Sequence, residues 1–293
     1  MSDYVYQPEA RMDFATAVQM LRSRGRQVVE RGIDNASPAV IAAIRAAASV
    51  AGLPLTPYRI NIADYRQYVH RAGYPTRYRD YYPGNQLEKS LEHYLAYRLL
   101  DLQPDDVFVD LASEYSPVPE IYQRLTGAQV YAQDIMYPEG LHGRHLGSDA
   151  CAMPVPDGFF SKATLTCSLE HFEQDADSRL FQELARVLRP GGMICVAPFY
   201  LYAEAATQTD PTLAVPANVP FDPDQVLYCA EGWGNRHGRF YSPASFLERI
   251  GHRFEPDFAF NAYHLINAHY RLFSAHPDHI PVYARFVFTA TRR

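Results

Sequence analysis

Residues 105–135 read DDVFVDLASEYSPVPEIYQRLTGAQVYAQDI, and this stretch decides the fold. Its apolar run over 105–113 stops at a turn, as a buried strand does. A helical pattern follows over 117–126, and a second strand-like run occupies 128–135. A strand, a helix and another strand at this spacing predict two parallel strands in one sheet, joined by a crossover helix.

The same alternation extends on both sides of this unit. A helix is predicted over about 87–101, strands over 160–169 and 192–200, and another helix over 175–188. We therefore predict an α/β fold with a doubly wound, mostly parallel sheet and an N-terminal helical extension. The final segment, 285–293, alternates apolar and polar residues and predicts a strand that lies antiparallel at the sheet edge.

The N-terminal region carries helical signals of its own. Apolar residues recur at helical spacing over 8–31, and a second helix is expected from Ser37, a good N-cap followed by proline, to Gly52. The tyrosine-rich stretch 53–86 is interpreted as an irregular connector, either a functional loop or a plain surface loop. Another capped helix is predicted over 241–251.

These signals divide the chain into two parts. Residues 1–86 form the extension, a lid or a dimer contact, and residues 87–293 form the main domain. Within the main domain, residues 201–240 are crowded with proline, asparagine and glycine and are expected to form an insertion on the substrate side.

Composition excludes some classes of function. The 293 residues carry a net charge of −6, which argues against a nucleic-acid partner because phosphate binding needs a basic surface. No apolar stretch is long enough for a membrane span, and the first residues lack a signal-peptide core, so a cytoplasmic protein without a membrane partner is expected. The cysteines have no metal-type spacing and are expected to be free thiols: Cys151, Cys167, Cys195 and Cys229.

Acidic residues stand where the predicted strands end. Asp110 closes the first strand, Asp134 closes the second, and Asp149 lies in the loop before the third. The third strand runs into CSLEHF (167–172), and RVLRPGG (186–192) leads into the fourth. Because ligands of open α/β sheets bind at the carboxyl ends of strands, these residues are expected to share one edge.

The series VDLAS, a strand ending in Asp134, DACAMPVPDGFF (149–160), CSLEHF and ELARVLRPGGMICVAPFY (183–200) resembles the class I S-adenosylmethionine-dependent methyltransferases, of the small-molecule (type 11) kind. The resemblance is good over 87–200 and looser over 239–293. It implies a methyltransferase with S-adenosylmethionine as cofactor and a hydroxyl, less favourably an amine, of a small molecule or sugar as acceptor.

The resemblance also implies roles at the strand ends. The Asp134 carboxylate would accept hydrogen bonds from the two ribose hydroxyls. Asp149 would accept from the adenine amine, Ala150 would offer its backbone N–H, and Asp110 would organise the first turn. The other cofactor contacts implied are Ala112, Ser113, Ile135, Ser168 and Leu169.

The first loop departs from the family's pattern. The family has glycines there, whereas this chain has none from 111 to 126. Glycine suits a tight turn that approaches a ligand closely. Small residues such as Ala112 and Ser113 still permit that approach. The alternative is a catalytically silent, methyltransferase-like binding or regulatory module. A nicotinamide enzyme is disfavoured because no GxGxxG follows the first strand.

Transfer to a hydroxyl requires a general base in addition to alignment of the reacting atoms. His171 is the predicted base, and Glu170 orients it or binds substrate. His93 and His237 are further candidates, expected on the surface or on a lid. The remaining candidate substrate contacts are the aromatic residues Tyr82, Tyr202 and Trp233. No metal is predicted. The extension is a candidate contact surface for a homodimer.

Overall fold

The computed structural model describes residues 11–268 and 283–293, which divide into two compact units. The first, called the sheet unit here, comprises residues 54–168, 179–199 and 251–293. The other, called the second unit, comprises 1–53, 169–178 and 200–250. This grouping differs from the expected boundary at residue 86, because the tyrosine-rich stretch packs into the core of the sheet unit.

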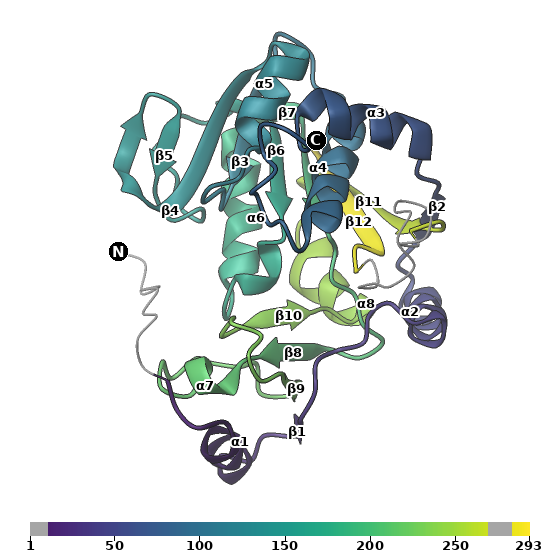
Figure 1. Ribbon diagram of the computed structural model, residues 1–293, viewed down its shortest axis with the longest axis vertical. Helices are drawn as coiled ribbons and strands as arrows, with labels where there is room; N and C mark the ends of the chain where they lie inside the picture. The colour runs from purple at the N-terminus through teal and green to yellow at the C-terminus, as the bar shows by residue number, and fades with distance from the viewer. Residues whose placement is uncertain (1–10, 269–282) are drawn as a thin grey trace. The chain divides into compact units, whose positions relative to one another are not determined.

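An eight-stranded sheet forms the centre of the sheet unit (Figure 1). In sheet order its strands are β2 (Leu55–Tyr58), β11 (Phe258–Leu265), β12 (Phe286–Arg292), β7 (Leu188–Ala197), β6 (Phe160–Thr166), β3 (Val107–Leu111), β4 (Gln129–His142) and β5 (His145–Gly147). The five strands from β7 to β5 are parallel, whereas β12 is antiparallel to both of its neighbours. The predicted C-terminal antiparallel strand is confirmed, but its edge position is wrong because β11 and β2 lie beyond it.

The strand order reverses beside β3. From β3 the chain continues to β4 and β5 on one side, and then crosses to β6 and β7 on the other. In open α/β sheets such a reversal leaves a crevice at the carboxyl ends of the strands, where ligands bind. The ends of β3, β4 and β6 are therefore the first place to look for a site.

Helices cover both faces of this sheet, as predicted for a doubly wound fold. On one face, α4 (Gln86–Leu100) packs on β6 and β7, while α5 (Val118–Thr126) packs on β3 and β4. On β12, Val287 points into the core beneath these helices, whereas Phe288 stacks on Phe181 of α6 (Ala176–Val187). Since successive strand residues point to opposite faces, α6 covers the other side.

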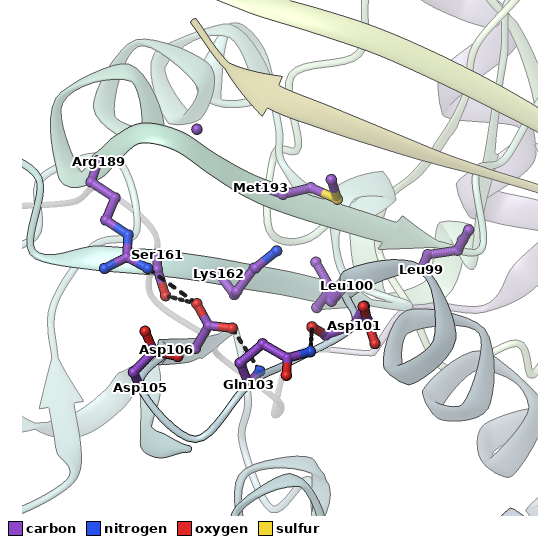
Figure 2. A pocket seen from close by; sticks show the side chains of 11 residues that line it. Leu99, Leu100, Asp101, Gln103, Asp105, Asp106, Ser161, Lys162, Arg189 and Met193 are labelled. Carbon is purple, nitrogen blue, oxygen red and sulfur yellow. Dashed lines mark hydrogen bonds and ion pairs between the residues drawn. The ribbon is translucent and has the colours of Figure 1, made fainter. Parts of the chain in front are cut away.

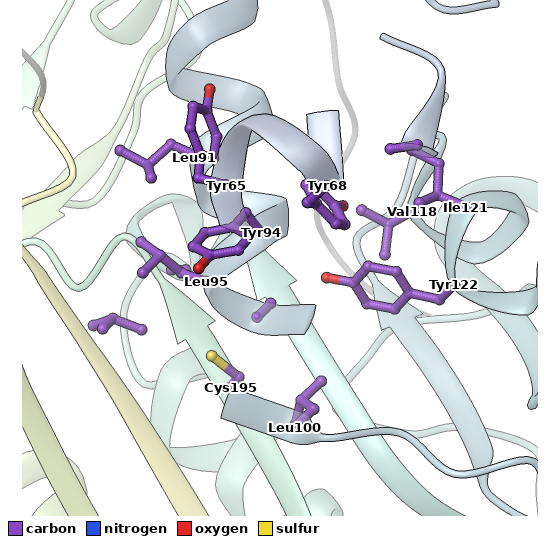
Figure 3. Packing of buried hydrophobic residues seen from close by; sticks show 14 of the residues in the cluster. Tyr65, Tyr68, Leu91, Tyr94, Leu95, Leu100, Val118, Ile121, Tyr122 and Cys195 are labelled. Atoms are coloured by element: carbon purple, nitrogen blue, oxygen red, sulfur yellow. The ribbon is translucent and has the colours of Figure 1, made fainter. Parts of the chain in front are cut away.

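Tyrosines build much of the core on the α4 face (Figure 3). Residues 53–86 are not the irregular connector expected, since they form β2 and the helix α3 (Ile62–Ala72), which is capped by Asn61 and ends at Gly73. The rings of Tyr65 and Tyr68 pack on Tyr94 of α4 at centroid distances of 5.4 and 5.6 Å. Aromatic pairs at such distances add stability beyond the apolar area they bury.

The second unit has its own small sheet and core. In sheet order the strands are β1 (Val28–Val29), β9 (Val226–Cys229), β8 (Ala206–Thr209) and β10 (Gly238–Phe240). Its helices are α1 (Phe14–Ser23), α2 (Pro38–Ala51), α7 (Pro211–Ala214) and α8 (Pro243–Phe246), the last continued by a π-helix over Leu247–Gly251. The predicted helix over 8–31 is too long, because Val28 and Val29 pair with β9. The expected loose insertion, 201–240, contains three strands.

The second predicted helix is confirmed in detail. Ser37 caps α2 through its side chain, proline occupies the first turn, and Gly52 ends the helix in the left-handed conformation (φ 77°). Within the described residues, no helix is both long and apolar enough to cross a membrane.

Candidate active site

Hydrogen bonds join the carboxyl end of β3 to the middle of β4. The prediction that Asp134 ends this strand is wrong, because β4 continues to His142 and pairs with β5 on both sides of a bulge. Ser113 donates its hydroxyl to the Asp110 carboxylate at 2.8 Å, and the backbone N–H of Glu114 donates to Asp134 at 2.8 Å. The side chain of Gln133 accepts from the Ala112 N–H at 3.2 Å and donates to the Ser148 carbonyl at 2.6 Å. The sequence did not reveal this bridging role of Gln133, since it depends on a loop that only the fold brings near.

The glycine-free first loop nevertheless adopts a glycine-like backbone. Ala112 has φ 49° and Glu114 has φ 46°, both in the left-handed region. Residues other than glycine enter that region at a cost of roughly 1–2 kcal/mol each. Backbone strain of this kind concentrates at functional sites, where the surrounding structure holds it in place.

Asp134 retains the capacity to hold a ligand. Its two carboxylate oxygens accept backbone N–H groups from Glu114 and Met136, each at 2.8 Å. An ionised carboxylate offers about four lone-pair sites, so two more donors, such as the hydroxyls of a ribose, still have acceptors. These two backbone groups fix the carboxylate while leaving part of its acceptor capacity unused.

Asp110 lies next to this carboxylate and is fully buried. Burial raises its pKa to about 7, the Asp134 charge adds to the rise, and hydrogen bonds from Ser113 and Ser116 oppose it. Its Oδ1 atom has no hydrogen-bond partner within the part of the chain that the structure describes. An unpartnered, buried carboxyl oxygen in this state leaves room for one more hydrogen bond or for a nearby positive charge, which would favour the ionised form.

The third predicted acid follows β5. The Asp149 carboxylate accepts the N–H of Cys151 at 2.9 Å, and the preceding Ser148 donates its N–H to the Asp134 carbonyl at 3.3 Å. Ala150 is buried, whereas Ile135 is 36% exposed. Ser168, also buried, follows β6 and donates its hydroxyl to the Thr166 carbonyl at the end of that strand, at 2.9 Å. The segments that carry the three aspartates are thus linked through backbone and side-chain bonds.

The predicted catalytic residues lie in the second unit, on a short 3₁₀ turn that runs from Leu169 to His171 directly after Ser168. The Nε2 atom of His171 is 3.6 Å from a carboxylate oxygen of Glu170. Its Nδ1 atom is 2.5 Å from the carbonyl oxygen of His237. Since a carbonyl only accepts, Nδ1 carries the proton and Nε2 of the neutral ring keeps its lone pair. His171 is one-third exposed.

Two predicted substrate residues accompany this histidine. The ring of Trp233 lies 6.2 Å from that of His171, and the Nδ1 atom of His237 is 3.0 Å from the Glu170 carbonyl. His237 is almost completely buried, so its expected place on a surface or lid is wrong. Tyr202 lies elsewhere in the second unit, with its hydroxyl 3.4 Å from that of Tyr228.

His93 is also wrongly expected at the surface. It is fully buried on α4, where the Tyr74 hydroxyl contacts its Nδ1 atom, and burial with the nearby Lys89 charge lowers its pKa to about 3. The helical face pattern missed this burial because α3 and the tyrosines cover α4. Tyr82 is half exposed, with the Lys89 ammonium 5.4 Å from its ring centre.

Charged side chains of α4 form a buried group that sequence reasoning missed. Lys89 pairs with Glu92 at 3.2 Å, and Glu88 accepts the backbone N–H groups of Tyr283 and Ala284 at 3.2 and 2.7 Å. Buried charges require such partners. The only sign of this group in the sequence is that Glu88, Lys89 and Glu92 stand close together in the helix that precedes the first buried strand.

A hollow of about 480 Å³ opens at the opposite end of the sheet, where β3, β6 and β7 begin (Figure 2). There Asp106 accepts hydrogen bonds from Ser161 at 2.7 Å and from the backbone of Gln103 at 2.8 Å, and it pairs with Arg189 at 3.3 Å. None of the predicted site residues lines it.

One segment of the chain is similar to a known family. Residues 98–196 match the family model described as a methyltransferase domain. This segment contains β3, β4, β6 and β7 and the loops just described. The predicted methyltransferase class is thereby confirmed for this segment of the chain.

Individual relatives align with only part of this chain or share little sequence identity with it. The demethylmenaquinone methyltransferase of Corynebacterium kroppenstedtii is 30% identical over 146 residues, covering 45% of this chain and 62% of that protein. The Thermus thermophilus protein of the same name is 36% identical over 89 residues, covering 26% and 39%. The chain therefore spans less than two thirds of either relative. A Burkholderia thailandensis 1,6-didemethyltoxoflavin-N1-methyltransferase structure aligns over 82% of this chain and 93% of its own, with 13% identity and a TM-score of 0.47.

Proposed function

We propose that the chain transfers a methyl group from S-adenosylmethionine to a hydroxyl oxygen of a small molecule or sugar. The observation that carries the cofactor half of the proposal is the Asp134 carboxylate, which accepts one N–H from the loop after β3 and one from β4 itself and has acceptor capacity to spare. The names of the curated relatives, demethylmenaquinone methyltransferases, support a small-molecule acceptor.

In this proposal each acid of the sheet unit has one task. Asp134 holds the ribose hydroxyls, and Asp110 supplies the unpaired buried oxygen for the amino acid part of the cofactor. Asp149 and the Ala150 N–H hold the adenine, with Ile135 as an apolar contact. Ala112, Ser113, Ser168 and Leu169 line the remainder.

The chemistry at the acceptor follows from His171. Its Nε2 lone pair takes the proton of the acceptor hydroxyl, and the Glu170 carboxylate, 3.6 Å away, stabilises the imidazolium that forms. When bound, S-adenosylmethionine supplies an electrophilic methyl group, so the oxygen–carbon bond forms as the carbon–sulfur bond breaks. The protein otherwise contributes alignment of the two reactants.

Calorimetry on the whole chain tests the cofactor half. We expect micromolar binding of S-adenosylmethionine and S-adenosylhomocysteine. Asp134→Asn, which keeps one carbonyl oxygen, should weaken binding about 100-fold, since charge-assisted hydrogen bonds contribute roughly 1.5–3 kcal/mol each. Asp105→Asn, at the other end of β3, is the matched control and should bind like the parent.

The same titration distinguishes the proposed enzyme from the alternative, a methyltransferase-like module without activity. No heat with either nucleoside, from a chain folded by circular dichroism, would favour a catalytically silent binding module. The glycine-free first loop is the feature that makes this alternative worth testing.

A further inference from the structure

Two segments of the second unit hold each other through their histidines. His171 donates its Nδ1–H to the His237 carbonyl, and His237 donates its Nδ1–H to the Glu170 carbonyl. Buried Arg239 reinforces the arrangement by donating to the carbonyls of Phe172 and Gln174 at 2.7 and 2.8 Å. The two segments that carry Glu170, His171 and His237 are thus held together by hydrogen bonds to the backbone.

This arrangement leaves buried acceptors without donors. The Nε2 atom of His237 and the Oε2 atom of Glu170 have no hydrogen-bond partner among residues 11–268 and 283–293, and both side chains are at least nine-tenths buried. Burial, with the charges of Arg239 and His171, lowers the pKa of His237 to about 3. Its ring therefore stays neutral near pH 7, and Nε2 remains an acceptor.

Unpaired buried acceptors are expensive, at roughly 1–3 kcal/mol each, and native proteins rarely keep them without a purpose. The nearby guanidinium of Arg239 is already used on backbone carbonyls and on Asp222. In the described part of the chain, no group of histidine, cysteine, aspartate and glutamate side chains is placed to hold a metal ion. A ligand that brings hydroxyl donors would satisfy both atoms.

An aromatic surface lies beside His171, whose Nε2 atom is 3.6 Å from the Glu170 carboxylate. Trp233 is half-buried, and a Cβ atom on Gly238 would lie 2.4 Å from its ring, so glycine is required for the indole to pack there. The ring is tilted by 38° to that of His171. A flat or ring-shaped ligand can pack on this surface while its hydroxyls reach polar groups, which is how sugars and hydroxylated aromatics are bound.

We infer that Glu170 and His237, with the ring of Trp233, form a recognition site for acceptor molecules that carry at least two hydroxyl groups on a ring. One hydroxyl meets His171 and is methylated, while another donates to Glu170 or His237. The methylation step rests on the proposed function, but recognition of the hydroxyl groups does not.

The chain contains one tryptophan, so its fluorescence reports on this site alone. We would titrate the whole chain with catechol, with methyl glucoside and with 1,2-dimethoxybenzene, exciting at the red edge of the indole band. A saturable change with at least one diol, at least tenfold weaker with the dimethoxy compound, supports the inference. The two diols distinguish an aromatic acceptor from a sugar.

Variants complete the test. His237→Phe and Glu170→Gln should each weaken diol binding about tenfold, while His70→Phe, an exposed histidine in the sheet unit, should not. If His237→Phe does not fold, Glu170→Gln decides. Equal binding of the dimethoxy compound, no saturable change with either diol, or a response to Zn²⁺ but not to diols would overturn the inference. Calorimetry with S-adenosylhomocysteine on the same sample shows separately whether the proposed function stands.

Discussion

The two ends of the eight-stranded sheet differ in how well their polar groups are satisfied. At the amino end, Asp106 has bonds from Gln103 and Ser161 and an ion pair with Arg189, beside an open hollow (Figure 2). At the carboxyl end, Asp110 is fully buried with one oxygen unpaired, and Ala112 stands in a left-handed conformation. Asp106 beside the open hollow is fully bonded, whereas the carboxyl end, for which we propose the cofactor site, is unsatisfied and strained. The family match covers both ends, so unmet bonding capacity, and not open space, is our guide to the site.

Strand β6 gives the sharpest contrast, because Lys162 lies at its start and His171 shortly beyond its end. His171→Ala should lower kcat about 10²- to 10³-fold, the usual contribution of a general base, while the Kd for S-adenosylhomocysteine stays unchanged. Lys162→Ala should leave both unchanged. The measurement is formation of S-adenosylhomocysteine with catechol as acceptor. Equal losses in the two variants would remove the distinction between the strand's ends.

Strand β3 offers a second contrast, between Asp110 near its end and Asp105 just before its start. Folded Asp110 keeps its proton up to about pH 7, whereas in the unfolded chain it loses the proton near 3.8. The folded state binds more protons in this window, so the free energy of unfolding falls from about pH 4 to 7 and then levels off. Asp110→Asn removes this fall and should be more stable than the parent at pH 8, by about 1–3 kcal/mol.

Urea unfolding of the unliganded chain at pH 5 and pH 8 measures the effect. Asp105→Asn, at an exposed residue, should show the same pH dependence as the parent. If the free energy of unfolding of Asp110→Asn changes with pH as that of the parent does, burial of Asp110 is not what distinguishes this end of the sheet.

The sequence predicted the parts of the molecule whose signals are local. The apolar runs over 105–113 and 160–169 correspond to β3 and β6. Ser37 and Gly52 cap the two ends of α2 as expected. Asp110 could be named because parallel strands end at one edge, whereas β4 continues past Asp134 to His142 and the predicted strand end there is wrong. Whether they hold the cofactor stays a prediction.

What the sequence did not reveal depends on distant partners. The sequence predicted a helix at Val28 and Val29, because their strand forms only by pairing with β9, which is distant in the sequence. His93 read as exposed because nothing local shows that tyrosines of another helix cover it. The strained backbone at Ala112 was equally hidden, since alanine there gives no sign of a left-handed turn.

The smallest expected effect tests that strain. Ala112→Gly should relieve about 1 kcal/mol of left-handed strain and lose about 0.5–1 kcal/mol through the greater freedom of glycine in the unfolded chain, leaving stability nearly unchanged. Ala46→Gly, on the exposed face of α2, has no strain to relieve and should cost about 1 kcal/mol. Urea midpoints of the two variants, with unchanged slopes, give the comparison. Because glycine fits the backbone already present, Ala112→Gly should also retain the parent's Kd for S-adenosylhomocysteine. Equal destabilisation by both substitutions would show that the loop does not need a glycine-like backbone, and the carboxyl end would then differ from the amino end by its unpaired carboxylate alone.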